Sequence, residues 1–284
     1  MIKIIDVGYL RDAKAEAYLK DDVNNLLAFT DFACMEALKG GVLSNIRNSL
    51  EIVAKYANQI LILKCLPEIM KVDYNLENFK ETFIDADQTL TFPKFCIKIV
   101  KSNGSDSEFE KDLLKRSQEA TECLDEKRKG AALVFEGIAA FNQQMDQKYL
   151  KYVRSGKKWT INEYQYACVQ ILKMCEILFE KNINNTKMPE KENFINHYIF
   201  RYTLSGYLLV LKWLKDHGWE SYPDEKKRND IIDMSYVTFA TYFDGVLSND
   251  KKINSIYPKV IKFIEFIKNN ASNNSLQRTV PAIR

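Results

Sequence analysis

The chain has 284 residues, 46% hydrophobic and 28% charged, so neither disorder nor a fibrous structure describes it as a whole. It has only 10 Gly and 6 Pro, and this shortage of turn-forming residues argues against a β-sandwich or propeller and favours helices. Because 41 basic residues nearly balance 38 acidic ones, any surface for nucleic acid has to be a local patch.

Strand and helix patterns alternate over residues 1–64. Short apolar runs predict strands at 2–5, 25–30 and 59–63. Apolar residues at helical spacing predict helices over 12–19, 32–39 and 44–57. The pair Gly40-Gly41 is expected to end the second helix. Almost wholly apolar strands that alternate with helices are typical of a parallel sheet covered on both faces, which predicts an α/β fold.

The middle of the chain is predicted to be mainly helical. Long helical patterns with almost no strand signal cover 105–181, and 193–216 predicts a further helix. Ser105 or Ser107 is the expected N-cap of the first long helix, and Thr160 with Glu163 has the form of a capping box. Residues 66–104 give no clear assignment.

An α/β pattern returns near residue 229. The sequence then predicts a helix over 229–242, a short strand over 245–247, a last helix over 253–269 and a polar, frayed tail over 270–284. The predicted organisation is a core in two halves, 1–64 and 229–269, with a mainly helical insertion over 65–228 between them.

The six cysteines predict neither a disulfide framework nor a zinc site. None forms a C-x-x-C pair, and only His197 and His217 supply imidazole. Neither histidine is expected to be catalytic, and His217 is expected to be a cation at a helix end. The first residues lack the core of a signal peptide, and no window approaches about 18 consecutive apolar residues. We therefore expect a cytoplasmic protein without a membrane span, with reduced and mostly buried cysteines.

Acidic residues follow three of the predicted strands, at Asp6, Asp31 and Asp250. Functional groups of open parallel sheets collect outside the carboxyl ends of the strands, so Asp6 and Asp250 would face each other if their strands are neighbours. The simpler interpretation is that such residues form turns or cap helices, as Asp31 would at residue 32.

Further acids lie on two predicted helices. Glu36 follows the second strand, and its simpler interpretation is a solvated helix residue. Asp230 and Asp233 are three apart, so both lie on one helical face. We expect Asp233 in the first turn, where the helix dipole favours a negative charge, while Asp230 would serve equally well as a cap.

Carboxylates that share a small cleft have raised pKa values unless a cation lies between them. With oxygen ligands and no convergent His or Cys, the expected cation is Mg²⁺ or Mn²⁺. Such an ion serves phosphoryl chemistry, because it activates water and neutralises charge on the phosphate oxygens. The acidic constellation therefore favours phosphoryl chemistry, although each acid taken singly has a structural interpretation.

The residues around these acids resemble those of PIN domains. Residues 229–236 and 243–251 resemble the C-terminal half of that family, in which an acid opens a helix and a short strand then ends in Ser-x-Asp. Ile4-Ile5-Asp6 resembles the first PIN strand. Residues 27–30 and 35–40 resemble the second strand and the helix that bears the family's glutamate.

The resemblance implies a PIN-like three-layer α/β/α sandwich and a metal-dependent nuclease, most often an endoribonuclease. The catalytic residues it implies are Asp6, Glu36, Asp233 and Asp250, which would also be the ligands of Mg²⁺ or Mn²⁺, with Ser248 as the accompanying hydroxyl. Asp31 and Asp230 do not match the core pattern and would support the ligands or cap helices. The long insertion departs from typical PIN domains and looks like that of a bacterial PIN-like protein, which leaves the substrate class open.

Two basic clusters are candidates for contacts with nucleic acid. Lys226, Lys227 and Arg228 precede the later acids, and Lys251 follows Asp250, so phosphate contacts are expected there. A plain charged loop explains the first three about equally well. The second cluster consists of Lys151, Arg154, Lys157, Lys158 and Trp159, with Tyr149 and Tyr152 nearby. A patch for phosphates with aromatic stacking fits it, but a solvated helix end and loop around Gly156 is the favoured interpretation.

Two other hypotheses keep the same fold. In one, the protein is a catalytically inactive PIN-like binding module whose helical insertion docks a partner protein or RNA. In the other, it is a toxin or defence nuclease that an inhibitory protein holds inactive by binding over the insertion. RNA is expected as the nucleic acid rather than DNA, no membrane partner is expected, and a homodimer is compatible with the sequence.

Overall fold

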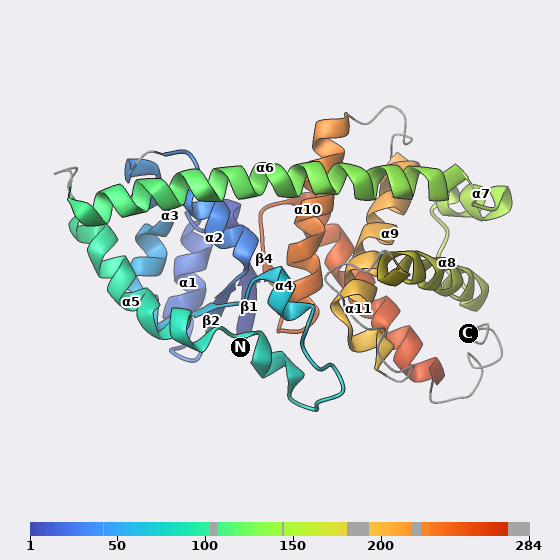
Figure 1. Cartoon of the computed structure of the whole chain (residues 1–284). Coiled ribbons are helices and arrows are strands. Elements are labelled where there is room, and N and C mark those ends of the chain that lie inside the picture. The colour runs from blue at the N-terminus through green and yellow to red at the C-terminus, as the bar shows by residue number, and fades with distance from the viewer. Residues whose placement is uncertain (42, 103–106, 144, 181–192, 217–222, 272–284) are drawn as a thin grey trace. The chain divides into compact units, whose positions relative to one another are not determined.

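The computed structural model describes the chain except for residues 42, 103–106, 144, 181–192, 217–222 and 272–284 (Figure 1). Three sequence predictions lie outside the described residues: the cap at Ser105, the role of His217 and nearly all of the tail. The chain divides into two compact units. Unit 1 is Met1–Gly130 with Tyr242–Asn254, and unit 2 is Ala131–Thr241 with Ser255–Arg284.

Unit 1 is built on a parallel sheet, as predicted. Its described strands are β1 (Ile2–Ile5), β2 (Leu26–Phe29), β3 (Ile60–Ile62) and β4 (Val246–Leu247). They lie in the order β3-β2-β1-β4 and are all parallel. β4 pairs with β1, Ile4 opposite Val246, although more than 200 residues separate them in the sequence. This confirms the α/β class and places the strands before Asp6 and Ser248 side by side.

Helices of unit 1 follow the strands where the sequence predicts them. They are the 3-10 turn η1 (Val7–Tyr9), α1 (Ala13–Asp21), α2 (Asp31–Leu38), α3 (Leu43–Lys55) and the 3-10 turn η2 (Ala57–Gln59). The side chain of Asp12 caps α1 by accepting from the N–H of Lys14. After α2, Gly40 and Gly41 have φ values of 101° and 65°, a left-handed conformation that glycine adopts without strain.

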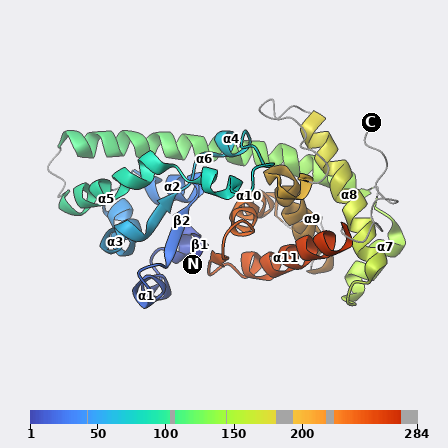
Figure 2. The ribbon, with the colours of Figure 1, turned by 90° about the horizontal axis from the view of Figure 1, so that it is seen from below.

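Residues 66–104, which the sequence left unassigned, begin with short elements and end in a longer helix. They comprise α4 (Leu66–Ile69), the 3-10 turn η3 (Phe79–Phe83) and α5 (Ala86–Lys101). Phe79 and Phe83 pack edge-to-face on Tyr242, with ring centroids 5.9 and 4.9 Å away. α5 packs against β3 and α3, and Figures 1 and 2 show α3 and α5 side by side.

Long helices dominate the rest of the chain, as predicted. α6 (Glu108–Gln143) begins in unit 1 and ends in unit 2. Unit 2 continues with α7 (Gln147–Ser155), α8 (Ile161–Glu180), the 3-10 turn η5 (Phe194–Asn196), α9 (Tyr198–Asp216) and α10 (Asp224–Ala240). The last helix is α11 (Lys251–Ala271). Ser107 and Glu110 form a reciprocal capping box before α6, which confirms one of the two expected caps.

The core of unit 2 surrounds α9. This helix is buried along most of its length and packs on α7, α8 and α10. The indole Nε1 of Trp213 donates to Asp230 Oδ2 over 3.1 Å, and the hydroxyl of Tyr207 donates to that of Tyr149 over 3.1 Å. Because buried polar groups are costly unless bonded, these pairs help to fix the packing of α7 and α10 on α9.

Other sequence predictions have clear outcomes. All six cysteines are free thiols, and Cys96, Cys168 and Cys175 are buried, whereas Cys65 is exposed. No helix among the described residues is long and apolar enough to cross a membrane.

Candidate functional site

The centre of the candidate site is a hydrogen bond between the ends of two neighbouring strands. Asp6 follows β1 and Ser248 follows β4. The hydroxyl of Ser248 donates to Asp6 Oδ2 over 2.6 Å, and the N–H of Gly8 donates to Asp6 Oδ1 over 3.2 Å. β1 has β2 on one side and β4 on the other, so the pair stands where the strand order reverses, the usual place for ligands in open α/β sheets.

Asp250 joins this pair through the backbone. Its N–H donates to Ser248 Oγ over 2.9 Å, so one hydroxyl connects Asp6 to the segment that carries Asp250. Asp250 also caps α11, because its Oδ1 accepts from the N–H groups of Lys252 and Ile253 over 2.5 and 3.1 Å. The strands that precede Asp6 and Asp250 are neighbours, as the expectation required, and Asp250 also has the simpler role of a helix cap.

The pKa of Asp6 is raised. Burial is the largest cause, because it disfavours the charged carboxylate. The hydrogen bonds from Ser248 and Gly8 oppose this effect, and the negative charges of Glu36 and Asp250 add to it. The carboxylates of Glu36 and Asp250 therefore lie near enough to Asp6 to raise its pKa.

Glu36 lies in α2 and is partly solvated. Its Oε1 is 3.4 Å from the ammonium group of Lys39, and its side chain is 27% exposed. Glu36 is thus a helix residue that is only partly solvated, and its charge acts on Asp6.

Asp31 makes contacts that the sequence did not predict. The N-cap residue of α2 is Thr30, whose hydroxyl accepts from the N–H of Ala33. Asp31 Oδ1 accepts from the N–H of Phe32 over 2.9 Å, so Asp31 also satisfies a donor at the start of this helix, as its simpler interpretation expected. Asp31 Oδ2 lies 3.2 Å from Lys127 Nζ in a largely buried ion pair. Lys127 comes from α6, 96 residues away, and no local pattern in the sequence indicates that pairing.

Asp230 and Asp233 belong to unit 2, whereas the other acids belong to unit 1. The helix that carries them, α10, begins at Asp224 rather than near residue 229. Asp233 is therefore not in the first turn, and the argument from the helix dipole is wrong for it. Asp230 is buried in the protein and lies in the second turn of α10, where its carboxylate accepts a hydrogen bond from the indole of Trp213. Asp230 is therefore not a helix cap either. The role of Asp233 as a ligand stays a prediction.

The first basic cluster is helical rather than a loop, because α10 begins before it. Lys227 is buried and lies 3.1 Å from Asp224, whereas Lys226 and Arg228 are exposed. Lys251 is the exposed first residue of α11. Phosphate contacts of these residues stay predictions, and the charged-loop interpretation is wrong.

The acids of unit 1 have the ligand type that a hard divalent cation prefers, but their side chains do not lie close enough together to coordinate one. Carboxylate oxygens are the ligands that Mg²⁺ and Mn²⁺ prefer. Within the described ranges, however, no group of three His, Cys, Asp or Glu side chains is arranged so that it could hold a metal ion. One oxygen of Asp250 is already bonded to two backbone N–H groups.

Comparison with known proteins adds no relative. No family model matches the chain, and neither a curated protein nor a solved structure matches it. The resemblance to PIN domains therefore rests on the quoted residues alone.

Proposed function

We propose that the protein is a PIN-like endoribonuclease that depends on Mg²⁺ or Mn²⁺ and acts at the carboxyl ends of β1 and β4. The observation that supports this most is the bond between Asp6 and Ser248, with Glu36 and Asp250 close enough to raise the pKa of Asp6. Negative charge gathered where the strand order reverses is a suitable environment for a cation.

The residues of unit 1 proposed to hold the cation are Asp6, Glu36 and Asp250. The bound ion would activate water and neutralise charge on the phosphate. Ser248 would hold the carboxylate of Asp6 in one orientation and would tie it to the backbone of Asp250. Beside a cation, Asp6 would remain ionised at neutral pH despite its burial, because an opposite charge favours the carboxylate.

The proposal requires the acids to move closer together when the cation binds. Asp250 Oδ1 accepts from the first turn of α11, whereas Oδ2 faces the ammonium group of Lys252 at 4.0 Å. A cation would compete with that ammonium for Oδ2. Binding of Mn²⁺ should therefore displace Lys252 from Asp250 without breaking the helix cap.

The test compares wild type with Asp6→Asn and Asp250→Asn on labelled single-stranded RNA and DNA, with Mn²⁺ or with chelator. We expect wild type to cleave RNA only with Mn²⁺ and both variants to lose at least about 100-fold in rate. Asn caps helices as well as Asp, so Asp250→Asn should keep α11 intact. Asp125→Asn, at an exposed acid of α6, is the matched control. Cleavage by Asp250→Asn at the wild-type rate would contradict the site assignment.

A second candidate function is an inactive binding module of the same fold. It is favoured by the structural contacts that each acid of unit 1 already makes, and by the lack of a metal-holding group among the described residues. Calorimetric titration with Mn²⁺ separates the two. If wild type takes up no Mn²⁺ and leaves both nucleic acids intact, the binding module is the better account.

A further inference from the structure

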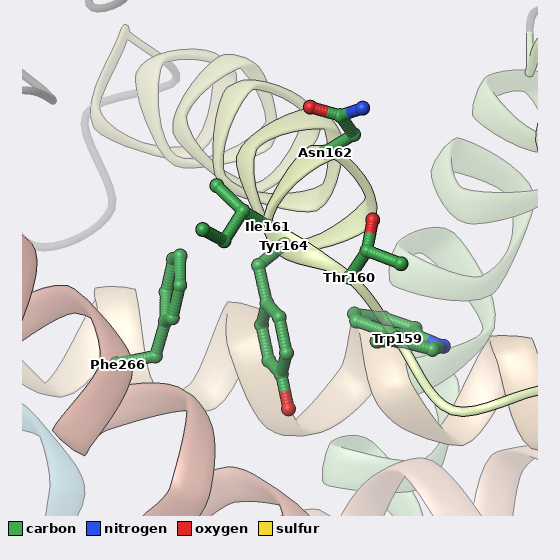
Figure 3. Close-up of a pocket in the computed structure, with 6 residues that line it drawn as sticks. All are labelled: Trp159, Thr160, Ile161, Asn162, Tyr164 and Phe266. Carbon is green, nitrogen blue, oxygen red and sulfur yellow. The ribbon is translucent and has the colours of Figure 1, made fainter.

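Unit 2 has an open pocket at the start of α8. None of the residues that line it is one of the acids of unit 1. The pocket has a volume of about 520 Å³ and is lined by Trp159, Thr160, Ile161, Asn162, Tyr164 and Phe266. Figure 3 shows these side chains at the first turn of α8 and on the facing helix α11. Ile161 is 60% exposed, which leaves apolar surface open to a ligand.

The aromatic walls of this pocket are held in place by a buried ring. Tyr164 stacks on Phe266 with centroids 4.5 Å apart, and Trp159 meets Tyr164 edge-to-face at 5.2 Å. Trp159 and Tyr164 also pack on Phe263, at 6.3 and 5.4 Å, and Phe263 is only 1% exposed. The rings are therefore positioned before any ligand arrives, which lowers the entropic cost of binding.

Positive charge gathers close to the same face of α11. Lys259 lies four residues before Phe263 and seven before Phe266, so the three share one face of that helix. The pKa of Lys259 is lowered, first by partial burial and then by the positive charges of Lys212 and Lys215 on α9, while Asp216 opposes them. Lys212 also forms an ion pair with Asp216, which neutralises part of this charge. An anion beside the lysines would relieve the remaining repulsion on Lys259.

The segment before α8 connects the lysines to the pocket. Gly156 ends α7 with a φ of 69°, and the ammonium group of Lys215 lies 3.2 Å from the position that a Cβ would take there. Lys157 and Lys158 follow and are exposed, and Trp159 then enters the pocket. Residues 156–160 therefore run from the ammonium groups to the aromatic rings.

Glu163 lies between two pocket-lining residues in the sequence, and its carboxylate already accepts hydrogen bonds. The carboxylate of Glu163 accepts from the N–H and hydroxyl of Thr160 over 2.9 and 2.5 Å. These bonds lower the pKa of Glu163. The arrangement matches the expected capping box in that Glu163 reaches back to the backbone of Thr160, and it keeps the start of α8 in place beside the rings.

We propose that this face of unit 2 binds single-stranded nucleic acid, with phosphates at Lys212, Lys215 and Lys259 and a base in the aromatic pocket. A ligand that has both negative charges and flat rings would bind the lysines and the aromatic pocket at the same time. Lys259 and Phe266 are seven residues apart along α11, or about 10 Å, so one short segment of a strand reaches both. The inference does not depend on the metal or on cleavage.

Binding is tested on the full chain in the presence of chelator, so that cleavage does not interfere. The probes are fluorescein-labelled oligouridylate and oligothymidylate, and the readout is anisotropy as a function of salt. Lys259→Gln should weaken binding several-fold at about 0.1 M salt and make the slope of log K against log salt shallower by about 0.7. Lys173→Gln, at an exposed lysine farther along α8, is the matched control and should change neither.

The pocket is tested separately from the charges. Trp159→Ala should weaken binding about tenfold through lost stacking, but Trp159 also packs on Phe263 and its loss risks the fold. Ile161→Asp is the second variant, because Ile161 is exposed and the fold should tolerate the change. It should also weaken binding about tenfold, because it places a negative charge where a base and its phosphate would lie.

Several results would overturn the inference. These are no binding of either probe, binding that neither Lys259→Gln nor Ile161→Asp weakens, an equal loss in Lys173→Gln, and equally tight binding of labelled polyglutamate. Binding in chelator without any cleavage in Mn²⁺ would uphold this inference and reject the nuclease. Cleavage by wild type without binding at this face would uphold the nuclease and reject this inference.

Discussion

Replacing Ser248 by alanine tests the contact that joins the two ends of the chain in unit 1. The hydroxyl donates to Asp6 Oδ2 over 2.6 Å and accepts from the N–H of Asp250 over 2.9 Å. A hydrogen bond to a charged group contributes about 1.5–3 kcal/mol and a neutral one about 1 kcal/mol. Because Ser248 is only 7% exposed, little water would replace the hydroxyl. We therefore expect a loss of about 2–4 kcal/mol in the free energy of unfolding.

The size of this loss should depend on pH. The bond from Ser248 lowers the pKa of Asp6, which burial raises, so the variant should have a still higher pKa at this residue. A carboxyl with a raised pKa binds its proton more tightly in the folded state. It therefore costs stability as pH rises from the unfolded pKa, near 4, through the folded value. The deficit of the variant should be larger at pH 7.5 than at pH 4.5.

Urea unfolding followed by far-ultraviolet circular dichroism measures this free energy at both pH values. Tryptophan fluorescence would be less informative, because all three tryptophans belong to unit 2. The control is Ser235→Ala. The Ser235 hydroxyl is buried with no hydrogen-bond partner among the described residues, so its removal should be neutral or stabilising. Equal effects of the two substitutions, or a Ser248→Ala deficit that shrinks as pH rises, would refute the reasoning.

Two further predictions concern ionisable groups in the packing. Lys127→Met should lower the free energy of unfolding by about 1–3 kcal/mol in urea titrations, because Asp31, 12% exposed, loses its cation at 3.2 Å. The same change at Lys115, in an exposed pair with Glu119, should stay within about 0.5 kcal/mol, and equal losses would contradict the argument. Burial lowers the pKa of His197 to about 4, so the folded state binds its proton more weakly than the unfolded state. Stability should thus fall as pH drops from about 6.5 to 4, by up to about 3 kcal/mol, and His197→Asn should flatten that decline in thermal melts at each pH.

Much of the secondary structure follows from patterns within a few residues. The apolar runs that form β1, β2 and β3, and the pair Gly40-Gly41 after α2, need no distant partner to be recognised. The start of α10 was predicted late because no side chain caps it, so the sequence carries no cap signal at Pro223. Boundaries without caps are set by packing, which a local pattern does not contain.

The candidate site was predictable in part. Asp6 was recognised by its position at a strand end and Ser248 through the resemblance to PIN domains, and the pairing of β1 with β4 brought them into contact. The partner of Asp31 was not predictable, because Lys127 is one of several lysines of α6 and only its position against unit 1 distinguishes it. Ion pairs between distant segments depend on which helix face packs inward.

By itself, the sequence determined the helix-rich α/β class, the order of most elements and the acids at strand ends, because propensity, caps and apolar spacing act locally. Only the tertiary structure decided that β4 lies beside β1, that Asp250 both caps α11 and approaches Asp6, and that a lysine-flanked aromatic pocket forms in unit 2. These features join segments far apart in the chain. Their formation depends on the summed burial of whole faces, and no short window of sequence contains that information.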